Sequence, residues 1–257
     1  MNELKALLFD VDGTLADTER DGHRVAFNRA FGDAGLDWDW TPELYGKLLA
    51  VTGGKERIRF YLDQFNTAFQ CPGDLDGFIR GLHAAKTEHY TRMLAEGAIP
   101  LRSGVKRLIE EARGAGLRLA VATTTTPANV EALLTHALAP DAMEWFEVIA
   151  AGDVVPAKKP APDIYLYAME QMNLQPGQCI AFEDSHNGIL ASHGAHLKTI
   201  IAVNGYTADD DFTGAAIVLD QWGEPDKPFT VLNGENAPLG QAARCLDLDL
   251  VKRLHAG

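Results

Sequence analysis

The sequence predicts an α/β fold in which a doubly wound, Rossmann-like parallel sheet forms the core and a helical cap domain is inserted near its beginning. Short apolar runs rich in Val, Ile and Leu are typical of strands and occur at residues 6–9, 117–122, 146–151, 179–182, 199–203 and 216–219. Segments of helical period, such as residues 105–112 and 163–172, precede two of these runs. This alternation indicates parallel strands with crossover helices on both faces, a fold that binds ligands at the strands' carboxyl ends.

A long insertion separates the first two strand-like runs. Residues 18–99 contain helical patterns and no convincing strand, whereas a simple crossover needs only about a dozen residues. We therefore expect a separate helical domain, hinged near residues 16–18 and 97–101, that can cover the strand ends as a lid. A short helical pattern lies near the C-terminus, around residues 246–254. The expected division of the chain is an α/β core at residues 1–17 and 98–220, a helical cap at 18–97 and a C-terminal extension packed on the core at 221–257.

The charge of the chain limits its partners. Asp and Glu number 36 against 23 Lys and Arg, so the 257 residues carry a net charge of −13. The resulting long-range field repels nucleic acid and anionic membranes, and a phosphorylated ligand must meet locally concentrated Lys or Arg. The three cysteines form no C-x-x-C pair, and no apolar run suits a signal peptide or a membrane span. We expect a cytoplasmic monomer with reduced thiols.

Two carboxylates stand where the first strand gives way to a turn. The sequence F-D-V-D-G-T-L at residues 9–15 places Asp10 and Asp12 two positions apart, and strand alternation points both side chains the same way. Because like charges so close repel, a divalent cation or a shared proton is the simplest offset. A solvated Asx turn is the competing interpretation of this motif.

Hydroxyl groups follow the second strand. Four threonines at residues 123–126 precede a Pro-led helical pattern that begins near Asn129. The hydroxyl of Thr123 and free backbone N–H groups such as that of Thr124 suit phosphate oxygens at a strand-to-helix turn. A threonine that only caps the following helix is the alternative.

Two further strand ends carry charged residues. Prolines at residues 160 and 162 pin Lys159 in a loop that leads into a helix, although a solvated lysine is the usual fate of this residue type. The fourth strand is followed directly by Glu183 and Asp184. Asp184 can complete a hard-cation site with Asp10, because Mg²⁺ takes carboxylate, carbonyl, water and phosphate oxygens.

In this order, the first acidic pair, the threonines, the lysine and the second acidic pair resemble the motifs of the haloacid-dehalogenase superfamily of phosphotransferases. The insertion is similar to the helical cap of the β-phosphoglucomutase-like members, and the resemblance of the core motifs covers residues 5 to about 203. It implies that Asp10 attacks phosphorus to form an aspartyl-phosphate, while Asp12 protonates the leaving alkoxide and later deprotonates the hydrolytic water.

The same resemblance implies a bound Mg²⁺ ion and a grip on the phosphoryl group. The ion is held by the Asp10 carboxylate, the Asp12 main-chain carbonyl and Asp184, with Glu183 either a direct ligand or a partner of the ligands. The transferring oxygens are held by Thr123, the Thr124 backbone N–H and Lys159.

Three segments of the insertion resemble the CbbY group of that superfamily: residues 18–24 (TERDGHR), 52–57 (TGGKER) and 83–87 (HAAKT). Members of this group hydrolyse xylulose 1,5-bisphosphate, a by-product of Rubisco, to phosphate and the Calvin-cycle intermediate xylulose 5-phosphate. The resemblance implies a phosphorylated sugar as substrate, although each cap residue taken singly is more ordinary as a solvated surface residue. The candidate contacts are Lys55, Arg57 and Lys86 for a distal phosphate, Gly53 and Gly54 for close backbone approach, and Glu19, His83 and Asn129 for sugar hydroxyls.

Other functions compete with a phosphatase. A phosphomutase passes the aspartyl-phosphate to another sugar hydroxyl instead of water, and the core motifs do not separate the two. A dehalogenase or an imine-forming phosphonate hydrolase has no need of the acid Asp12. A non-catalytic phosphate-binding module has no need of the intact Asp10 and Asp12 pair.

Overall fold

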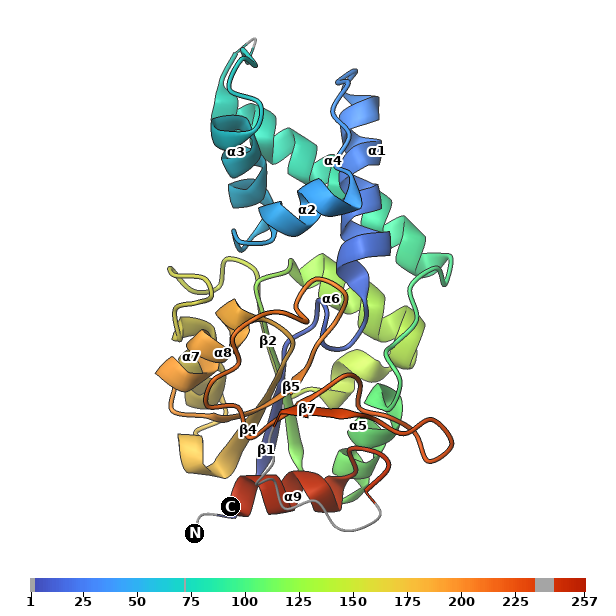
Figure 1. Cartoon of the computed structure of the whole chain (residues 1–257), viewed down its shortest axis with the longest axis vertical. Coiled ribbons are helices and arrows are strands. Elements are labelled where there is room, and N and C mark those ends of the chain that lie inside the picture. The colour runs from blue at the N-terminus through green and yellow to red at the C-terminus, as the bar shows by residue number, and fades with distance from the viewer. Residues whose placement is uncertain (1–2, 72, 234–242) are drawn as a thin grey trace.

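The computed structural model describes residues 3–71, 73–233 and 243–257. A seven-stranded sheet runs through the lower part of the molecule in the order β3-β2-β1-β4-β5-β6-β7 (Figure 1). Neighbouring strands are parallel except β6 and β7, which are antiparallel. The strands are β1 (Ala6–Phe9), β2 (Arg118–Thr123), β3 (Val148–Ala151), β4 (Cys179–Glu183), β5 (Lys198–Ala202), β6 (Ile217–Leu219) and β7 (Val231–Asn233).

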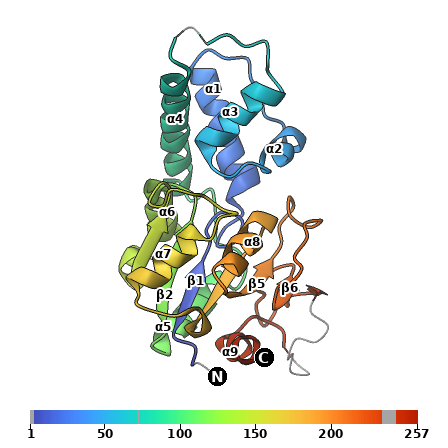
Figure 2. The same cartoon turned by 90° about the vertical axis from the view of Figure 1, so that its left-hand side faces the viewer.

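Helices cover both faces of this sheet (Figure 2), which confirms the predicted doubly wound α/β fold. Along β1, Leu7 and Phe9 pack in one apolar cluster with α5 and α9, whereas Ala6 and Leu8 pack in another with α7 and α8. The two clusters follow from the strand period, since successive side chains point to opposite faces. These helices are α5 (Val105–Gly114), α7 (Asp163–Gln171), α8 (His186–Gly194) and α9 (Leu248–Ala256), and the core also contains α6 (Pro127–Leu133).

The strand order reverses at β1, which determines where a ligand site can form. β1 pairs in parallel with β2 on one side and with β4 on the other. The crossovers therefore leave in opposite directions, and a crevice opens beyond the carboxyl ends of β1 and β4. Phe9 lies opposite Phe182 in the register, so the acidic residues that follow each strand emerge side by side.

A separate helical layer stands above the carboxyl ends of the strands (Figures 1 and 2). It has an aromatic core of its own, in which Phe31, Trp38 and Trp40 pack together. Among the described residues between 18 and 97, none forms a strand. We call residues 18–97 the cap. Its helices are α1 (Arg24–Asp33), α2 (Pro42–Leu48), α3 (Gly54–Gln64) and α4 (Leu75–Ala95), preceded by a π-helical turn at Glu19–His23.

The two linkers between core and cap lie side by side. Ala16 forms an isolated bridge with Leu101, and the backbone N–H of Arg102 donates to the Leu15 carbonyl at 2.8 Å. The guanidinium of Arg102 is largely buried and donates to four backbone carbonyls, those of Gly13, Ala202, Val203 and Asp220. This one side chain therefore ties the loop after β1 to the ends of β5 and β6.

The C-terminal region contains one strand that sequence analysis missed. β7 is only three residues long and largely exposed, and it follows a stretch rich in Gly and Pro, so no apolar pattern marks it. The helix α9 lies close to the expected helical pattern, with Leu250, Val251 and Leu254 buried in the core. Residues 234–242 of the expected extension lie outside the described residues. Within the described ranges, no helix combines the length and apolar character needed to cross a bilayer.

Candidate active site

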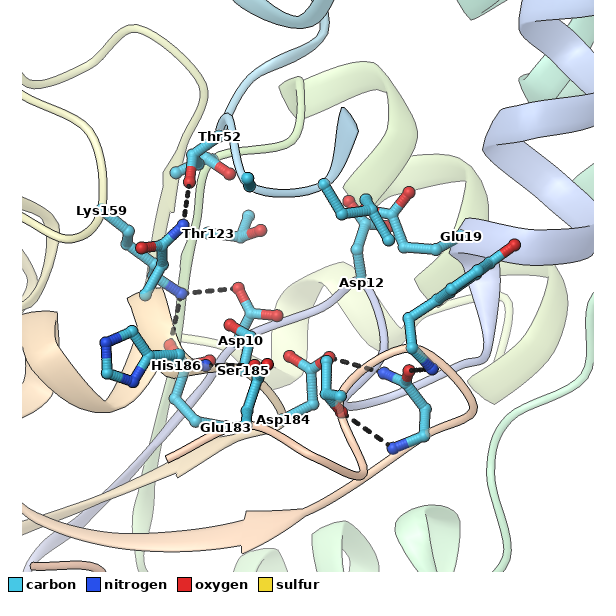
Figure 3. A pocket seen from close by; sticks show the side chains of 18 of the residues that line it. Asp10, Asp12, Glu19, Thr52, Thr123, Lys159, Glu183, Asp184, Ser185 and His186 are labelled. Carbon is cyan, nitrogen blue, oxygen red and sulfur yellow. Dashed lines mark hydrogen bonds and ion pairs between the residues drawn. The ribbon is translucent and has the colours of Figure 1, made fainter. Parts of the chain in front are cut away.

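The carboxyl ends of β1 and β4 bring three carboxylates together. Asp10 follows β1, Glu183 ends β4 and Asp184 comes next, and one oxygen from each lies within 4.8 Å of the others. All three are buried at the bottom of a cavity of about 440 Å³ that opens toward the cap (Figure 3). Three acidic groups at such spacing repel one another unless a cation or a proton separates them.

Lys159 supplies one of the balancing charges. Its Nζ lies 2.6 Å from Asp10 Oδ1 and 2.6 Å from Glu183 Oε1, reaching between the two side chains (Figure 3). Tyr165 also donates its hydroxyl to Glu183 Oε1 at 2.5 Å. Burial raises the pKa of Asp10 to about 7, although the charge of Lys159 opposes this rise. Burial alone would lower the pKa of Lys159, but Asp10 and Glu183 raise it above its usual value.

The donor set around Asp184 fits a hard cation such as Mg²⁺. Burial, and then the charges of Asp10 and Glu183, raise the pKa of Asp184 well above its usual value, so one lysine does not neutralise the trio. Oε2 of Glu183 is buried without a hydrogen-bond partner among the described residues. A Cβ on Gly13 would lie 2.2 Å from Asp184 Oδ2, so only glycine lets this carboxylate approach the loop. Close-set oxygen ligands are what Mg²⁺ prefers.

Two polar side chains hold these carboxylates in place. Asn204, which follows β5, donates its Nδ2 to Asp184 Oδ2 at 2.6 Å. The Thr14 hydroxyl lies 3.3 Å from Asp10 Oδ2 and 3.4 Å from Asp184 Oδ1. Neither residue is among those singled out by sequence analysis. The strand-end argument applied to β5 would have identified Asn204, whereas Thr14 has no signal beyond its place in the F-D-V-D-G-T-L motif.

Asp12 lies in the same loop, but its side chain contacts the cap side of the cavity. Its Oδ1 accepts hydrogen bonds from the Thr18 hydroxyl at 2.6 Å and from His23 Nε2 at 2.7 Å. Burial alone would raise the pKa of Asp12, but His23 and the hydrogen bond of Thr18 hold it below its usual range. Its charge is therefore offset by the cap and not only by the metal or proton that the sequence indicates.

His23 connects Asp12 to a buried lysine of the cap. Lys86 Nζ lies 2.8 Å from His23 Nδ1, and only one proton can lie between these two nitrogens. Burial lowers the pKa of Lys86 to about 8, although Asp12 and Glu19 act in the opposite direction. Sequence analysis missed His23, whose position four residues after Glu19 on one helical face is the only signal for it.

A second cavity of about 180 Å³ lies between the cap and the core, on the other side of Asp12. The turn at Gly53 and Gly54 contributes to its wall, where Gly53 has φ of +99°. A Cβ on Gly54 would lie 2.6 Å from the His83 ring. Burial, and then the charge of Lys86, lower the pKa of His83 to about 4, so its imidazole is neutral at pH 7. The structure brings together here Glu19, Gly53, Gly54, Lys55, Arg57, His83, Lys86, Thr124 and Asn129.

Glu19 and Arg57 are linked by a tyrosine that sequence analysis missed. Tyr45, buried in α2, donates its hydroxyl to Glu19 Oε2 at 2.5 Å and accepts from Arg57 Nη1 at 2.6 Å. Both Glu19 and Arg57 line the two cavities. A buried aromatic residue in an amphipathic helix gives no sequence signal that separates it from ordinary core.

The threonine loop divides its tasks between the cavity and the helix. Thr126 caps α6, with its hydroxyl accepting from the Asn129 backbone N–H at 3.4 Å, while Thr123 and Thr124 line the larger cavity. The Asn129 side chain donates to Thr125 Oγ1 at 2.8 Å. Its Oδ1 is buried and has no partner among the described residues, so an acceptor is available beside the second cavity.

The chain is similar to several known proteins. A profile of the haloacid dehalogenase-like hydrolases matches residues 4–196. The plasmid-encoded CbbY protein of Cupriavidus necator is 44% identical over 254 residues, covering 99% of this chain and 98% of its own. The crystal structure of CbbY from Rhodobacter sphaeroides with phosphate has a TM-score of 0.79 and 48% identity, covering 85% of this chain and 94% of that one. A mutant of the R. sphaeroides protein, in complex with xylulose 1,5-bisphosphate, matches with the same values.

Proposed function

Because the chain belongs to the haloacid dehalogenase-like hydrolases, we propose that it is a Mg²⁺-dependent phosphatase that converts xylulose 1,5-bisphosphate to xylulose 5-phosphate and phosphate. The observation that carries this proposal is the pair of cavities that meet at Asp12. One contains the nucleophile, and the other contains cations that suit a second phosphate. The bisphosphate in the R. sphaeroides CbbY complex supports the choice of substrate.

In the first half-reaction, an oxygen of the Asp10 carboxylate attacks phosphorus and the sugar oxygen leaves. Lys159 and the Thr124 backbone N–H hold the equatorial oxygens, and the Thr123 hydroxyl is placed to assist them. A bound Mg²⁺ ion would be held by Asp10, Asp184 and the Asp12 main-chain carbonyl, and it would supply positive charge to the phosphoryl group. Glu183 orients Lys159 through their 2.6 Å contact.

Asp12 exchanges protons with the leaving and attacking oxygens. It must be protonated to give a proton to the leaving alkoxide, although the contact with His23 favours its ionised form. The arriving phosphate dianion changes this balance, because a nearby negative charge raises the pKa of a carboxyl group. After the sugar leaves, ionised Asp12 takes a proton from water, which attacks the aspartyl-phosphate and releases phosphate.

The distal phosphate occupies the smaller cavity. Lys86 and Arg57 provide buried positive charge, Lys55 lies at the rim, and the Gly53 and Gly54 turn lets the backbone approach. Glu19, the neutral His83 and the free Oδ1 of Asn129 provide hydrogen-bond partners for sugar hydroxyls. This binding energy closes the cap and orients the reacting phosphate, so it raises kcat and not only affinity.

A substrate panel tests the proposal. The purified enzyme with Mg²⁺ is offered xylulose 1,5-bisphosphate, ribulose 1,5-bisphosphate, β-glucose 1-phosphate and p-nitrophenyl phosphate, and released phosphate is measured. We expect the highest kcat/KM on xylulose 1,5-bisphosphate and, in H₂¹⁸O, label in the released phosphate. An isomerised sugar phosphate without free phosphate would identify a mutase instead.

A further inference from the structure

Two ion pairs cross between the cap and the core in opposite directions. Lys55 of the cap lies 2.6 Å from Asp153 of the core, while Lys158 of the core lies 3.0 Å from Glu56 of the cap. Lys158 also lies 3.1 Å from Asp153, so the four charges form one network. We call these four residues the latch.

The latch is packed against the turn that lines the smaller cavity. A Cβ on Gly53 would lie 2.3 Å from Glu56 Oε2 and 2.9 Å from Lys158 Nζ, so both charged groups contact the backbone of this turn. The Lys158 side chain is only 17% exposed, although it carries a charge near the surface. Lys158 is therefore more buried than a typical surface lysine, because most lysines leave their ammonium group in water.

Lys158 also precedes Lys159, whose Nζ contacts Asp10. Adjacent residues of one loop thus contact the nucleophile and the cap. Any opening of the cap separates Lys158 from Glu56 and Lys55 from Asp153, since each pair spans the two parts of the chain. In the structure both pairs are formed and the Gly53 turn lines the smaller cavity.

We propose that Lys158 and Glu56 are positioning residues, whose ion pair fixes the Gly53 turn over the carboxyl ends of the strands while the cap is closed. The pair acts on the substrate through the turn, with Lys158 Nζ lying between the carboxylates of Glu56 and Asp153. This inference rests on the proposed function for its substrate. It assigns a positioning role to Lys158 and Glu56, which take no direct part in the phosphate chemistry.

A cycle of neutral variants tests the latch. Lys158→Gln, Glu56→Gln and the double variant are compared on xylulose 1,5-bisphosphate at low salt. Each single change should lower kcat/KM about three- to fivefold, and the double variant should be no worse than the poorer single one. Turnover of p-nitrophenyl phosphate should change less than about twofold, because it has no group in the smaller cavity. The exposed pair Lys106 and Glu110 on α5, 3.9 Å apart, provides matched Gln controls.

Hydrogen exchange gives a second measurement that needs no substrate. Amides of residues 52–57 should exchange faster in either single variant, and in the double variant no faster than in the poorer single one, while the Lys106→Gln and Glu110→Gln controls leave them unchanged. Losses that multiply in the double variant would overturn the proposal. So would a much larger loss for Lys158→Gln than for Glu56→Gln, which would mean that Lys158 binds the phosphate directly. If the native enzyme does not hydrolyse the bisphosphate, the proposed function fails, and the exchange data alone decide whether the latch exists.

Discussion

The two cavities meet at Asp12, and acidic residues dominate the larger one whereas cations slightly outnumber carboxylates in the smaller one. The larger one gathers Asp10, Glu183 and Asp184 around Lys159, whereas the smaller one is lined by four cations, Lys55, Arg57, Lys86 and Lys158, and by three carboxylates. An acidic cavity accepts a phosphate dianion only when a metal ion compensates the charge, but a cationic one accepts it directly. On the proposed function, the reacting phosphate depends on a metal ion and the distal phosphate on side-chain cations, so each end of the substrate can be perturbed separately.

The largest effect should come from the nucleophile. Asp10→Asn conserves the shape of the side chain but removes the attacking oxygen, and we expect kcat to fall by at least about a thousandfold. The cap keeps its cations, so the bisphosphate should still bind with Mg²⁺ present, as measured by calorimetry. Near-native turnover would contradict the proposed chemistry, and loss of all binding would mean that the smaller cavity is not an independent anchor.

Metal removal should affect the two cavities differently. With EDTA, turnover of both xylulose 1,5-bisphosphate and p-nitrophenyl phosphate should disappear and return when Mg²⁺ is added, because the acidic trio then repels phosphate. Binding of the bisphosphate to the metal-free protein should weaken but remain measurable through Lys86 and Arg57. Full activity without a divalent cation would be incompatible with the proposed site.

Lys86→Ala should affect the two substrates differently. A hydrogen bond to a charged group contributes about 1.5 to 3 kcal/mol, so kcat/KM on the bisphosphate should fall about ten- to a hundredfold. p-Nitrophenyl phosphate has no distal phosphate and a leaving group that needs little help from Asp12, so its loss should stay below about threefold. Lys47→Ala, at an exposed position of α2, is the control. Equal losses on both substrates would assign Lys86 to cap packing or to Asp12.

The pH profile should also reflect Lys86. Its pKa of about 8 means that the charge is present below that pH and is lost as the pH rises through it. Because kcat/KM reports the free enzyme, its value on the bisphosphate should decrease above about pH 8. Lys86→Arg keeps the charge at high pH and should abolish this decrease. If kcat/KM of Lys86→Arg decreases at the same pH, the decrease must come from another titrating group.

The sequence predicts the core more fully than the cap, for a physical reason. In a parallel sheet, strand alternation and the order of the strands determine which residues leave the carboxyl ends together, so the meeting of Asp10, Lys159 and Asp184 can be anticipated. β7 could not be predicted from an apolar pattern, because it is short and largely exposed. In the cap, contacts depend on how helices pack, so Tyr45 has no sequence signal and His23 has only its spacing from Glu19.

The smallest effect should come from Tyr45→Phe, which tests whether the cap's polar groups are held in place before the substrate arrives. The hydroxyl bridges Glu19 and Arg57, and without it these two can still pair directly, since they are already 3.5 Å apart. We therefore expect a loss of about 1 kcal/mol, seen as a KM on the bisphosphate raised about fivefold with kcat nearly unchanged. Turnover of p-nitrophenyl phosphate should not change.

Tyr61→Phe is the matched control for this prediction, because Tyr61 belongs to the same aromatic cluster and lies outside both cavities. If Tyr45→Phe both lowers the melting temperature and raises KM, the hydroxyl stabilises the fold of the cap. If KM changes while the melting temperature does not, Tyr45 arranges Glu19 and Arg57 for the substrate. A rise in KM for both tyrosine variants would show that the smaller cavity responds to any loosening of the cap. The smaller cavity would then not be a preorganised cationic site, and its contrast with the metal-dependent acidic cavity would have to be abandoned.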